Sequence, residues 1–341
     1  MVKGVRSKER GRAERGSTVF EQKQNYLRRK TMKKIVYMLA IGLLAVIVVA
    51  CGASGDATSD NGNGDESSSG ASSEETTDEM STLDRIKEEG KVTVGVANEK
   101  PYGFKTAEGE VTGVAPEIAR AIFEDMGIET VEGEVTEFGS LIPGLQANRF
   151  DLITAGMDIR PERCEEADFG DIEIQYGEGM AVQAGNPKNL HSYEDIAANP
   201  DVKVSIMAGA NQFDFLKALG VKEEQIETAD SISSNISAVA SGRVDATVMT
   251  EATLNEAVAS ADPSQVEKAE PFTQPVIDGE SVMSYGAAAF RKGDDELREA
   301  YNEGLQKLKE SGKLLEILEE FGFSEDNLPP DDITTEDRCN S

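Results

Sequence analysis

Apolar and polar residues alternate from residue 92 onward with the spacings of buried strands and amphipathic helices. In the first half of the chain, the predicted elements are a strand at 92–97, a helix at 115–126, a helix at 138–146 and a strand at 151–155 that ends at Ala155-Gly156. The first of these helices carries Ile118, Ile122 and Met126 on one face. Strands that alternate with helices in this way indicate an α/β architecture with mostly parallel strands.

A second group of elements follows after residue 200. It comprises a strand at 202–207, helices at 213–218 and 231–241, a strand at 244–248, a strand at 283–290 and a helix at 294–309. The last helix has one apolar stripe, formed by Leu297, Tyr301, Leu305 and Leu308. Because the segment 82–323 is longer than one compact core usually is, the sequence predicts two lobes.

A basic and then apolar segment near the N-terminus predicts export. Met32-Lys33-Lys34 precedes an apolar run at 35–50, and Cys51 follows that run. This order is typical of a secretory signal, and a cysteine at the cut site is typical of a lipobox. We therefore predict that residues 32–51 are a lipoprotein signal peptide and that Cys51 is acylated. The alternative is an uncleaved anchor, although the run is shorter than the about 20 apolar residues that span a bilayer.

Three further segments have compositions that predict no packed core. Residues 1–31 are basic and polar, and we assign this N-terminal extension no function. Residues 52–81 are rich in Gly, Ser, Thr, Asp and Glu, with few apolar residues, and predict a disordered acidic linker. Residues 326–341 contain Pro329-Pro330 and predict a flexible tail.

The charge of the chain is strongly negative and unevenly distributed. The chain has 64 acidic and 34 basic residues, for a formal net charge of −30 at pH 7, and the residues before 35 are rich in Lys and Arg. Binding to nucleic acid or to anionic headgroups needs a basic face, so we exclude these partners for the remainder of the chain. An acidic excess of this size repels itself unless salt screens it, which favours a salt-adapted organism.

The cysteines and the histidine do not suggest a metal site. Besides Cys51, the chain has Cys164 and Cys339, which could pair outside the membrane or could stay apart if the predicted tail is flexible. His191 is the only histidine, and the cysteine spacing does not match that of zinc ligands. We therefore predict no metal and no cofactor.

Two arginines follow the predicted strand at 151–155. Arg160 and Arg163 come shortly after Gly156, where a small carboxylate could be anchored. The guanidinium group is planar, always charged and able to bind a carboxylate through two parallel hydrogen bonds. The alternative is that both arginines are surface partners of the nearby acidic residues Glu162, Glu165 and Glu166.

Several segments resemble the solute-binding proteins of ABC importers that take up polar amino acids. The resemblance covers residues 83–323 and is carried by LDRIKEEGKVTVGVANEKPYGF (83–104), PEIARAIFEDMG (116–127), FGSLIPGLQANRFDLITAGMDIRPERCEEADF (138–169), SGRVDATVM (241–249) and YGAAAFRKGDDEL (285–297). Two further segments resemble the branch of that family that binds ectoine and hydroxyectoine: NPKNLHSYEDIAANPDVKVSIMAGA (186–210) and AEPFTQPVIDG (269–279).

This resemblance implies the type II periplasmic-binding-protein fold, an α/β fold with a ligand cleft between two lobes that two hinge strands join. The crossovers would lie near Glu173–Gly177 and Val282–Tyr285. Lobe 1 would then comprise residues 82–177 and 282–325, and lobe 2 would comprise residues 178–281. The ligand would bind at the carboxyl ends of strands, and the lobes would close around it.

For the carboxylate of the ligand, the resemblance implies a site around Arg163. This residue occupies the position of the arginine that family members use, whereas Arg160 would be peripheral. Gly209, Ala210 and Asn211 match a loop whose backbone N–H groups and side chain typically complete the carboxylate site.

For the cation of the ligand, the resemblance implies an aromatic wall and a carboxylate. Tyr102 and Phe138 occupy the aromatic positions, with Phe104 nearby, and aromatic faces attract a desolvated cation. Glu99, which follows the predicted strand at 92–97, could accept hydrogen bonds from amidinium N–H groups. The alternative is that the three aromatic residues only pack within their lobe.

Two positions depart from the family pattern. Relatives that bind α-amino acids have an aspartate for the ammonium group after the GR-x-DA motif, where this chain has Thr250; the adjacent Glu251 is expected on the surface. The missing carboxylate suits the delocalised amidinium of ectoine. The ectoine branch would have a third aromatic residue near 158, where this chain has Asp158. Asp158 could pair with the cation of the ligand or with Arg163, or it could indicate a more cationic ligand.

The expected function is that of a monomeric, lipid-anchored binding protein on the extracytoplasmic face, which captures ectoine or hydroxyectoine and delivers it to a permease and its ATPase. The chain has no Trp, which disfavours the Trp cages that hold betaines. One alternative is a polar or cationic amino acid as the ligand. Others are an enzyme that resembles the cyclohexadienyl dehydratases, for which Glu99 or Asp158 would be the general acid, and a sensory domain. The sequence shows neither a nucleophile–base pair nor the spanning helix and output domain of a sensor.

Overall fold

A computed structural model describes residues 80–340 of the chain. The predicted basic extension at 1–31, the predicted lipoprotein signal at 32–51 with Cys51, and nearly all of the predicted acidic linker at 52–81 lie outside the described residues. Within the part that is described, every helix is too short or too polar to cross a membrane.

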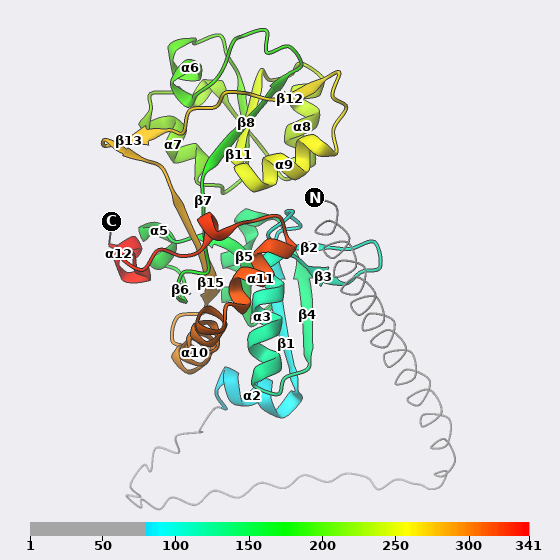
Figure 1. Ribbon diagram of the computed structural model, residues 1–341, viewed down its shortest axis with the longest axis vertical. Helices are drawn as coiled ribbons and strands as arrows, with labels where there is room; N and C mark the ends of the chain where they lie inside the picture. Colours follow the sequence, from blue (N-terminus) through cyan, green and yellow to red (C-terminus); the bar gives the residue numbers. More distant parts are fainter. Residues whose placement is uncertain (1–79, 341) are drawn as a thin grey trace, which may run out of the picture. The chain divides into compact units, whose positions relative to one another are not determined.

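Lobe 1 is built on a mixed sheet. Its strands are β1 (Lys91–Val96), β4 (Thr130–Val135), β5 (Leu152–Asp158), β6 (Asp168–Phe169), β7 (Ile174–Tyr176) and β15 (Ser284–Phe290) (Figure 1). The strand order is β4-β1-β5-β15-β6, and β7 also pairs with β15. β1 lies parallel to β4 and β5, whereas β15 runs antiparallel to β5. Because β15 comes from a distant part of the sequence, lobe 1 is discontinuous.

Helices cover this sheet and enclose the core of lobe 1. They are α2 (Thr82–Glu89), α3 (Val114–Asp125), α4 (Leu141–Gln146), α5 (Pro161–Cys164), α10 (Asp295–Ser311) and α11 (Lys313–Glu320). Along α10, the apolar stripe predicted from the sequence turns inward, and Leu297, Tyr301 and Leu305 are buried. α10 packs beside α3, where the rings of Tyr301 and Phe123 have their centroids 6.0 Å apart.

Lobe 2 has a sheet and a core of its own. Its strands are β8 (Glu178–Gln183), β9 (Val204–Met207), β10 (Ile226–Ala229), β11 (Ala246–Thr250) and β12 (Val266–Lys268), in the order β10-β9-β11-β8-β12. β9 is parallel to β10 and β11, and β8 is antiparallel to β11 and β12. The helices are α6 (Tyr193–Ala198), α7 (Gln212–Ala218), α8 (Ile232–Ala240) and α9 (Glu251–Ala259). Val204, Val248 and Leu216 are buried in this second core.

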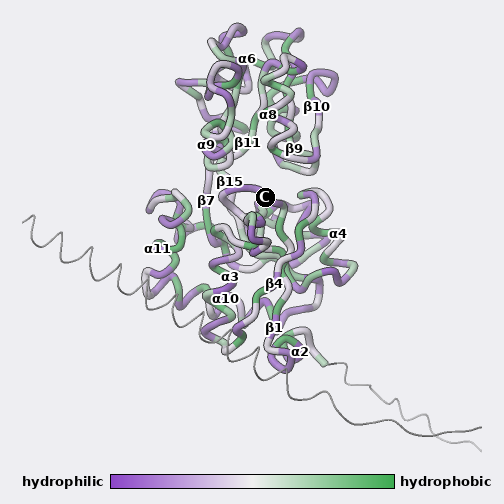
Figure 2. The backbone as a smooth tube through the Cα atoms, turned by 90° about the vertical axis from the view of Figure 1, so that its right-hand side faces the viewer, coloured by the Kyte–Doolittle hydropathy of each residue, from purple (hydrophilic) through white to green (hydrophobic). Residues whose placement is uncertain are grey.

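Two stretches of chain connect the lobes. The first crosses between Tyr176 and Glu178, and the second enters β15 after the hairpin of β13 (Val276–Ile277) and β14 (Glu280–Ser281). Hydrophobic segments follow the strands within each lobe, and the connecting loops are mostly hydrophilic (Figure 2). The α/β architecture with two lobes is therefore confirmed.

The end of β5 differs from the prediction in a way that shapes the site. The strand continues past Ala155-Gly156 to Asp158. Gly156 has a φ of 58°, and the pairing of β5 with β15 shifts register beside it, after which the ladder resumes at Met157 and Asp158. This irregularity places Asp158 at the end of the central strand of lobe 1.

The prediction of a flexible tail at 326–341 is wrong for the residues that the structure describes. A 3-10 turn, η3, spans Glu325–Asn327, and helix α12 spans Thr335–Cys339. A disulfide joins Cys339 to Cys164, which answers the question of pairing that the sequence left open. Ile333 also packs against an apolar cluster of lobe 1. The composition of residues 326–341 is typical of a loop, but the disulfide and these contacts hold the segment against lobe 1.

Candidate ligand-binding site

A cavity lies between the two lobes, at the ends of β1, β5, β9 and β11. Its place at strand ends is the usual one for ligand sites in open α/β sheets. It is lined by Glu99, Tyr102, Phe138, Ala155, Gly156, Asp158, Arg163 and Tyr176 of lobe 1 and by Met207, Ala210, Asn211, Gln212, Ile232, Val248, Met249 and Thr250 of lobe 2. Every predicted binding residue except Gly209 is among them.

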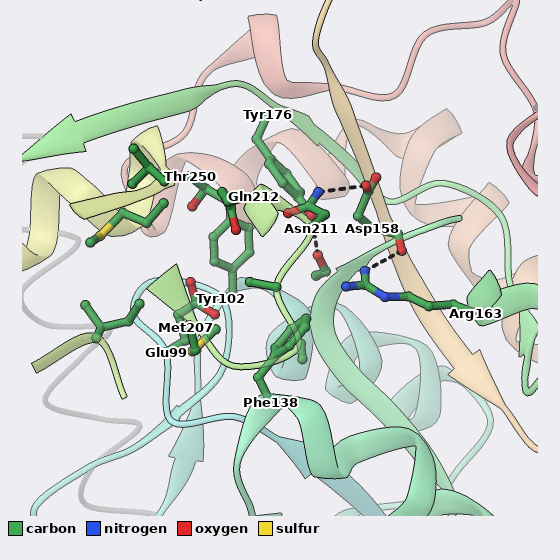
Figure 3. A pocket seen from close by; sticks show the side chains of 16 residues that line it. Glu99, Tyr102, Phe138, Asp158, Arg163, Tyr176, Met207, Asn211, Gln212 and Thr250 are labelled. Carbon is green, nitrogen blue, oxygen red and sulfur yellow. Dashed lines mark hydrogen bonds between the residues drawn. The ribbon is translucent and has the colours of Figure 1, made fainter. Parts of the chain in front are cut away.

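Arg163 lies at one end of the cavity, on the single turn of α5 (Figure 3). Its Nη1 donates to the main-chain oxygen of Asp158 at 2.8 Å, and its Nη2 donates to the main-chain oxygen of Gly209 in lobe 2 at 3.0 Å. The guanidinium carbon lies 5.4 Å from the centroid of the Phe138 ring. A guanidinium has five N–H donors, so the two carbonyl bonds orient the group and leave donors for an anionic ligand.

Arg160 lies beside the cavity rather than in it. Its Nε donates to the carboxylate of Glu162 at 2.6 Å, and its Nη2 lies 3.3 Å from the carboxylate of Asp214 in lobe 2. The alternative interpretation of the two arginines as partners of nearby acids therefore fits Arg160 and does not fit Arg163.

The loop after β9 contacts lobe 1 closely. Gly209 has a φ of 80°, and a Cβ there would lie 2.8 Å from the Cα of Gly139, so the approach of the two loops requires glycine. The side-chain amide of Asn211 donates to Asp158 Oδ2 at 2.9 Å and to Ser284 Oγ at 3.0 Å. The resemblance implied that backbone N–H groups of this loop face the ligand, but the contact of Gly209 with Arg163 is made by its carbonyl.

Both carboxylate oxygens of Asp158 accept hydrogen bonds, one from lobe 1 and one from lobe 2. Oδ1 accepts a hydrogen bond from the main-chain N–H of Tyr285 at 2.7 Å, and Oδ2 accepts the bond from Asn211. Burial raises the pKa of Asp158, opposed by the positive charge of Arg163 and by these two hydrogen bonds. The pairing of the Asp158 and Arg163 side chains that the sequence left open is not the contact observed, because Arg163 binds the main-chain oxygen instead.

Glu99 and Arg163 lie at different ends of the cavity, and the rings of Tyr102 and Phe138 lie between them (Figure 3). It is 8% exposed, and its carboxylate accepts a hydrogen bond from Thr253 Oγ1 of lobe 2 at 2.7 Å. Burial raises the pKa of Glu99 to about 7, with the Thr253 hydrogen bond opposing this shift. A cation placed beside Glu99 would favour its ionised form.

Two tyrosines form much of the aromatic wall. Tyr102 packs edge-on against Tyr176, with ring centroids 5.2 Å apart, and Tyr176 donates its hydroxyl proton to the carbonyl of Gly156 at 2.8 Å. Burial raises the pKa of both phenols well above its ordinary value, so both are neutral. Phe104 does not reach this wall; it lines a separate hollow, 5.1 Å from the Lys100 ammonium.

Thr250 begins α9 as its N-cap. Its Oγ1 accepts from the main-chain N–H of Thr253 at 3.4 Å and donates to Thr253 Oγ1 at 3.0 Å. Thr253 in turn donates to Glu99, so the Thr250 hydroxyl is linked to the Glu99 carboxylate through Thr253. Glu251 is exposed, as predicted.

Sequence reasoning missed Glu178, which lies behind the cavity at the start of β8. It is 1% exposed, and its Oε2 accepts hydrogen bonds from the Gln212 amide at 2.8 Å and from the Tyr193 hydroxyl at 3.0 Å. Burial raises its pKa to about 7, with those two bonds opposing the shift. An acidic residue at the first position of an apolar strand, directly after a predicted hinge, is the signal that could have identified it.

The cavity thus combines buried carboxyl groups with one guanidinium group. A ligand that carries a separated anion and cation could neutralise both ends at once. Among residues 80–340, the structure contains no group of three or more His, Cys, Asp or Glu side chains placed to hold a metal ion.

The chain is similar to several known solute-binding proteins. A probable amino-acid ABC transporter periplasmic-binding protein of Sinorhizobium fredii is 43% identical over 263 residues, which make up 76% of this chain and 86% of the relative. The crystal structure of EhuB in complex with hydroxyectoine is 36% identical, with a TM-score of 0.69 over 76% of this chain and 97% of EhuB. An ancestral arginine-binding protein bound to arginine is 30% identical, with a TM-score of 0.59 over 68% of this chain and 98% of the ancestor.

These likenesses confirm the type II periplasmic-binding-protein fold that the resemblance implied. The sequence model of the bacterial extracellular solute-binding proteins, family 3, matches residues 92–324, which include both lobes and the whole cavity. The chain therefore belongs to the bacterial extracellular solute-binding proteins, family 3, and is a solute-binding protein of the amino-acid ABC transporter type.

Proposed function

We propose that this protein captures ectoine or hydroxyectoine outside the membrane and delivers it to the permease of an ABC importer. The observation that carries the proposal is a buried carboxylate, Glu99, and a guanidinium, Arg163, at different ends of one aromatic cavity. Ectoine is a cyclic amidinium with a single carboxylate, so its two charged groups match these two ends. The likeness to EhuB, whose crystal structure holds hydroxyectoine, supports the same ligand class.

In this proposal, Arg163 binds the carboxylate of the ligand. The guanidinium donates to the carbonyls of Asp158 and Gly209, and the bond to Asp158, within lobe 1, can orient it before the ligand arrives, which reduces the entropy lost on binding. One of those carbonyls belongs to each lobe. A ligand carboxylate on the remaining N–H groups would therefore be held where the lobes meet, and binding would favour the arrangement in which they touch.

The amidinium of the ligand faces Glu99 and the aromatic rings. Tyr102 and Phe138 can each attract a desolvated cation by roughly 0.5–2 kcal/mol. Thr250 stands where relatives that bind α-amino acids have an aspartate, and its hydroxyl is bonded to Thr253. A hydroxyl group does not neutralise a buried ammonium, so the site suits a delocalised cation better than a free α-amino group.

A cationic amino acid is the second candidate ligand, and one observation favours it. Asp158 in the cavity and Glu178 behind it add buried carboxyl groups to that of Glu99, so that acidic groups outnumber the guanidinium in this region. The likeness to an ancestral protein bound to arginine points the same way. Both oxygens of Asp158 already have partners in Tyr285 and Asn211, which is why we place this candidate second.

We further propose that Cys51 is acylated and anchors the protein at the extracytoplasmic face, with residues 52–81 as a tether. The partners would be a membrane permease and its ATPase, and the protein would act as a monomer that binds its solute without converting it. Radiolabelled fatty acid should be incorporated by the unchanged protein and lost in Cys51→Ser. Equal labelling of the two would contradict the anchor.

The test of the ligand is calorimetric titration of the full-length protein, in high salt, with ectoine, hydroxyectoine, glycine betaine, arginine, lysine and glutamine. We expect micromolar or tighter binding of ectoine or hydroxyectoine and no binding of glycine betaine. Binding of arginine or lysine without ectoine would establish the second candidate instead. Failure of every solute in the panel would overturn the proposed ligand class.

A further inference from the structure

The C-terminal residues 324–340, here called the C-terminal clasp, contact both connections between the lobes. The first contact is with β7, the strand that leads into lobe 2. Gln175 Nε2 donates to the main-chain oxygen of Asp326 at 3.0 Å, and Asn327 Nδ2 donates to the main-chain oxygen of Gln175, also at 3.0 Å. The side chain and the carbonyl of one hinge residue are therefore both held by the clasp.

The second contact is with β15, the strand that returns from lobe 2. The guanidinium of Arg338 lies 5.1 Å from the centroid of the Tyr285 ring. The main-chain N–H of Tyr285 holds the carboxylate of Asp158 inside the cavity. Ile333 of the clasp packs against the same apolar cluster to which Tyr285 belongs. Tyr285 thus connects the clasp to Asp158, which lines the cavity.

The third contact is covalent and reaches the residue next to Arg163. Cys339 at the end of α12 is bonded to Cys164, 175 residues earlier in the chain. Cys164 is the last residue of α5, which is a single turn of four residues. So short a helix is not stable by itself. The position of Arg163 therefore depends on what the turn is attached to, and the disulfide attaches it covalently to the clasp.

We propose that the C-terminal clasp positions Arg163 and steadies the two hinge strands, so that the Cys164–Cys339 bond sets the affinity for ligand. The inference rests on the proposed role of Arg163 in binding the anionic group of the ligand. A guanidinium must meet a carboxylate with correct geometry, and small displacements of a binding group have large effects. Lobe closure is a change at a few hinge residues, so contacts at Gln175 and Tyr285 bias the equilibrium between open and closed forms.

A purely stabilising role is the alternative, because the loss of a disulfide lowers stability whatever else it does. The two roles differ in what happens to the folded protein. If the bond only stabilises, ligand affinity measured well below the melting temperature stays unchanged when it is removed. If the clasp positions Arg163, affinity falls although the protein is folded.

The experiment compares the full-length protein with the double variant Cys164→Ser/Cys339→Ser, titrated with hydroxyectoine and with arginine well below both melting temperatures. We expect Kd of the bound probe to rise roughly 5–150-fold, the range typical of coupling between two sites. Dithiothreitol should produce the same rise in the unchanged protein and no rise in the double variant. An unchanged Kd in the double variant would overturn the inference.

The matched control for stability is Leu297→Ala, which empties part of the lobe 1 core on α10 and lies outside both the clasp and the cavity lining. It should lower the melting temperature and leave Kd unchanged. Asn327→Ala keeps the disulfide but loses one bond to Gln175. We expect Kd to rise less in Asn327→Ala than in the double variant. If Kd rose as much in Leu297→Ala as in the double variant, the inference would be overturned.

Hydrogen exchange without ligand separates this inference from the proposed function. In the double variant, amides at 162–167 and 174–176 should exchange faster than in the unchanged protein, while those of β10 should not change. If neither hydroxyectoine nor arginine binds the unchanged protein, the proposed ligand is wrong. Hydrogen exchange then tests by itself whether the clasp steadies α5 and β7. If the amides at 162–167 and at 174–176 exchanged at the same rates in the double variant as in the unchanged protein, the inference would be overturned.

Discussion

Protonation of Glu99 should control how tightly the cation of the ligand binds. The carboxyl group is buried, its one hydrogen bond comes from Thr253, and burial raises its pKa to about 7. A cation beside Glu99 takes the place of a proton, so binding requires the ionised form. Lowering the pH below 7 therefore makes the ligand compete with a proton, and Kd should rise.

The magnitude follows from the pKa. Each pH unit below the pKa costs about 1.4 kcal/mol, a tenfold change in Kd, which gives up to about a hundredfold between pH 7 and pH 5. Stability changes in the opposite direction. Because the pKa of folded Glu99 lies above its ordinary 4.5, the stability that its proton provides is present below pH 4.5 and is lost as the pH rises through 7. By pH 8 the loss amounts to about 3 kcal/mol.

The assay is calorimetric titration between pH 5 and pH 8, paired with denaturant unfolding of the ligand-free protein. Glu99→Gln keeps an acceptor for Thr253 but cannot ionise, so its Kd should vary less with pH and its stability at pH 8 should rise. Asp158 and Glu178 also have pKa values raised by burial, so part of the pH dependence should remain.

Glu173→Gln is the matched control. Burial also raises the pKa of Glu173 to about 7, and its carboxylate accepts a hydrogen bond from the Tyr301 hydroxyl at 2.6 Å, but it does not line the cavity. This variant should change the pH dependence of stability and leave that of Kd intact. A Kd that changes with pH equally in Glu99→Gln and in the unchanged protein would refute the reasoning.

Three further predictions concern other parts of the molecule. Phe138→Ala should weaken ligand binding by about 1–3 kcal/mol in calorimetric titration, because an aromatic contact with the cation is lost; an unchanged Kd would argue that the ring only packs. Asp158→Asn should weaken every ligand by about 1–3 kcal/mol, since a buried acceptor that joins the lobes is lost; weakening of cationic amino acids alone would instead indicate a direct ligand contact. The denaturant midpoint should rise from low to molar NaCl as salt screens the acidic surface, and a flat response would contradict salt adaptation.

Much of lobe 1 and of its cavity wall could be predicted because the relevant residues follow strand ends. Glu99 comes after β1, and Asp158 and Arg163 come after the apolar run of β5, where ligand sites of open α/β sheets are found. The roles of these residues in ligand binding were predicted from the family resemblance. Their spacing alone was also compatible with surface ion pairs between the arginines and nearby acidic residues. The alternation of strands and helices was sufficient to predict the α/β architecture.

Contacts between the lobes could not be predicted from local patterns. The bonds from Thr253 to Glu99 and from Asn211 to Asp158 join residues 154 and 53 positions apart, and they depend on how the two lobes face each other. Tyr176 reaches the cavity from a hinge strand of three residues, too short to show a period. The order of the C-terminal clasp was missed because one disulfide and a few hydrogen bonds leave no hydrophobic repeat.

The central claim is that Arg163 binds the anionic group of the ligand, and titration of Arg163→Ala tests it most directly. The comparison uses the solute that the unchanged protein binds, with Arg149→Ala as the control, because Arg149 is half exposed and pairs only with Glu134 among the ion pairs of the described residues. The account predicts that Arg163→Ala keeps its melting temperature and shows no binding, while Arg149→Ala binds as the unchanged protein does. Near-normal affinity in folded Arg163→Ala would contradict it.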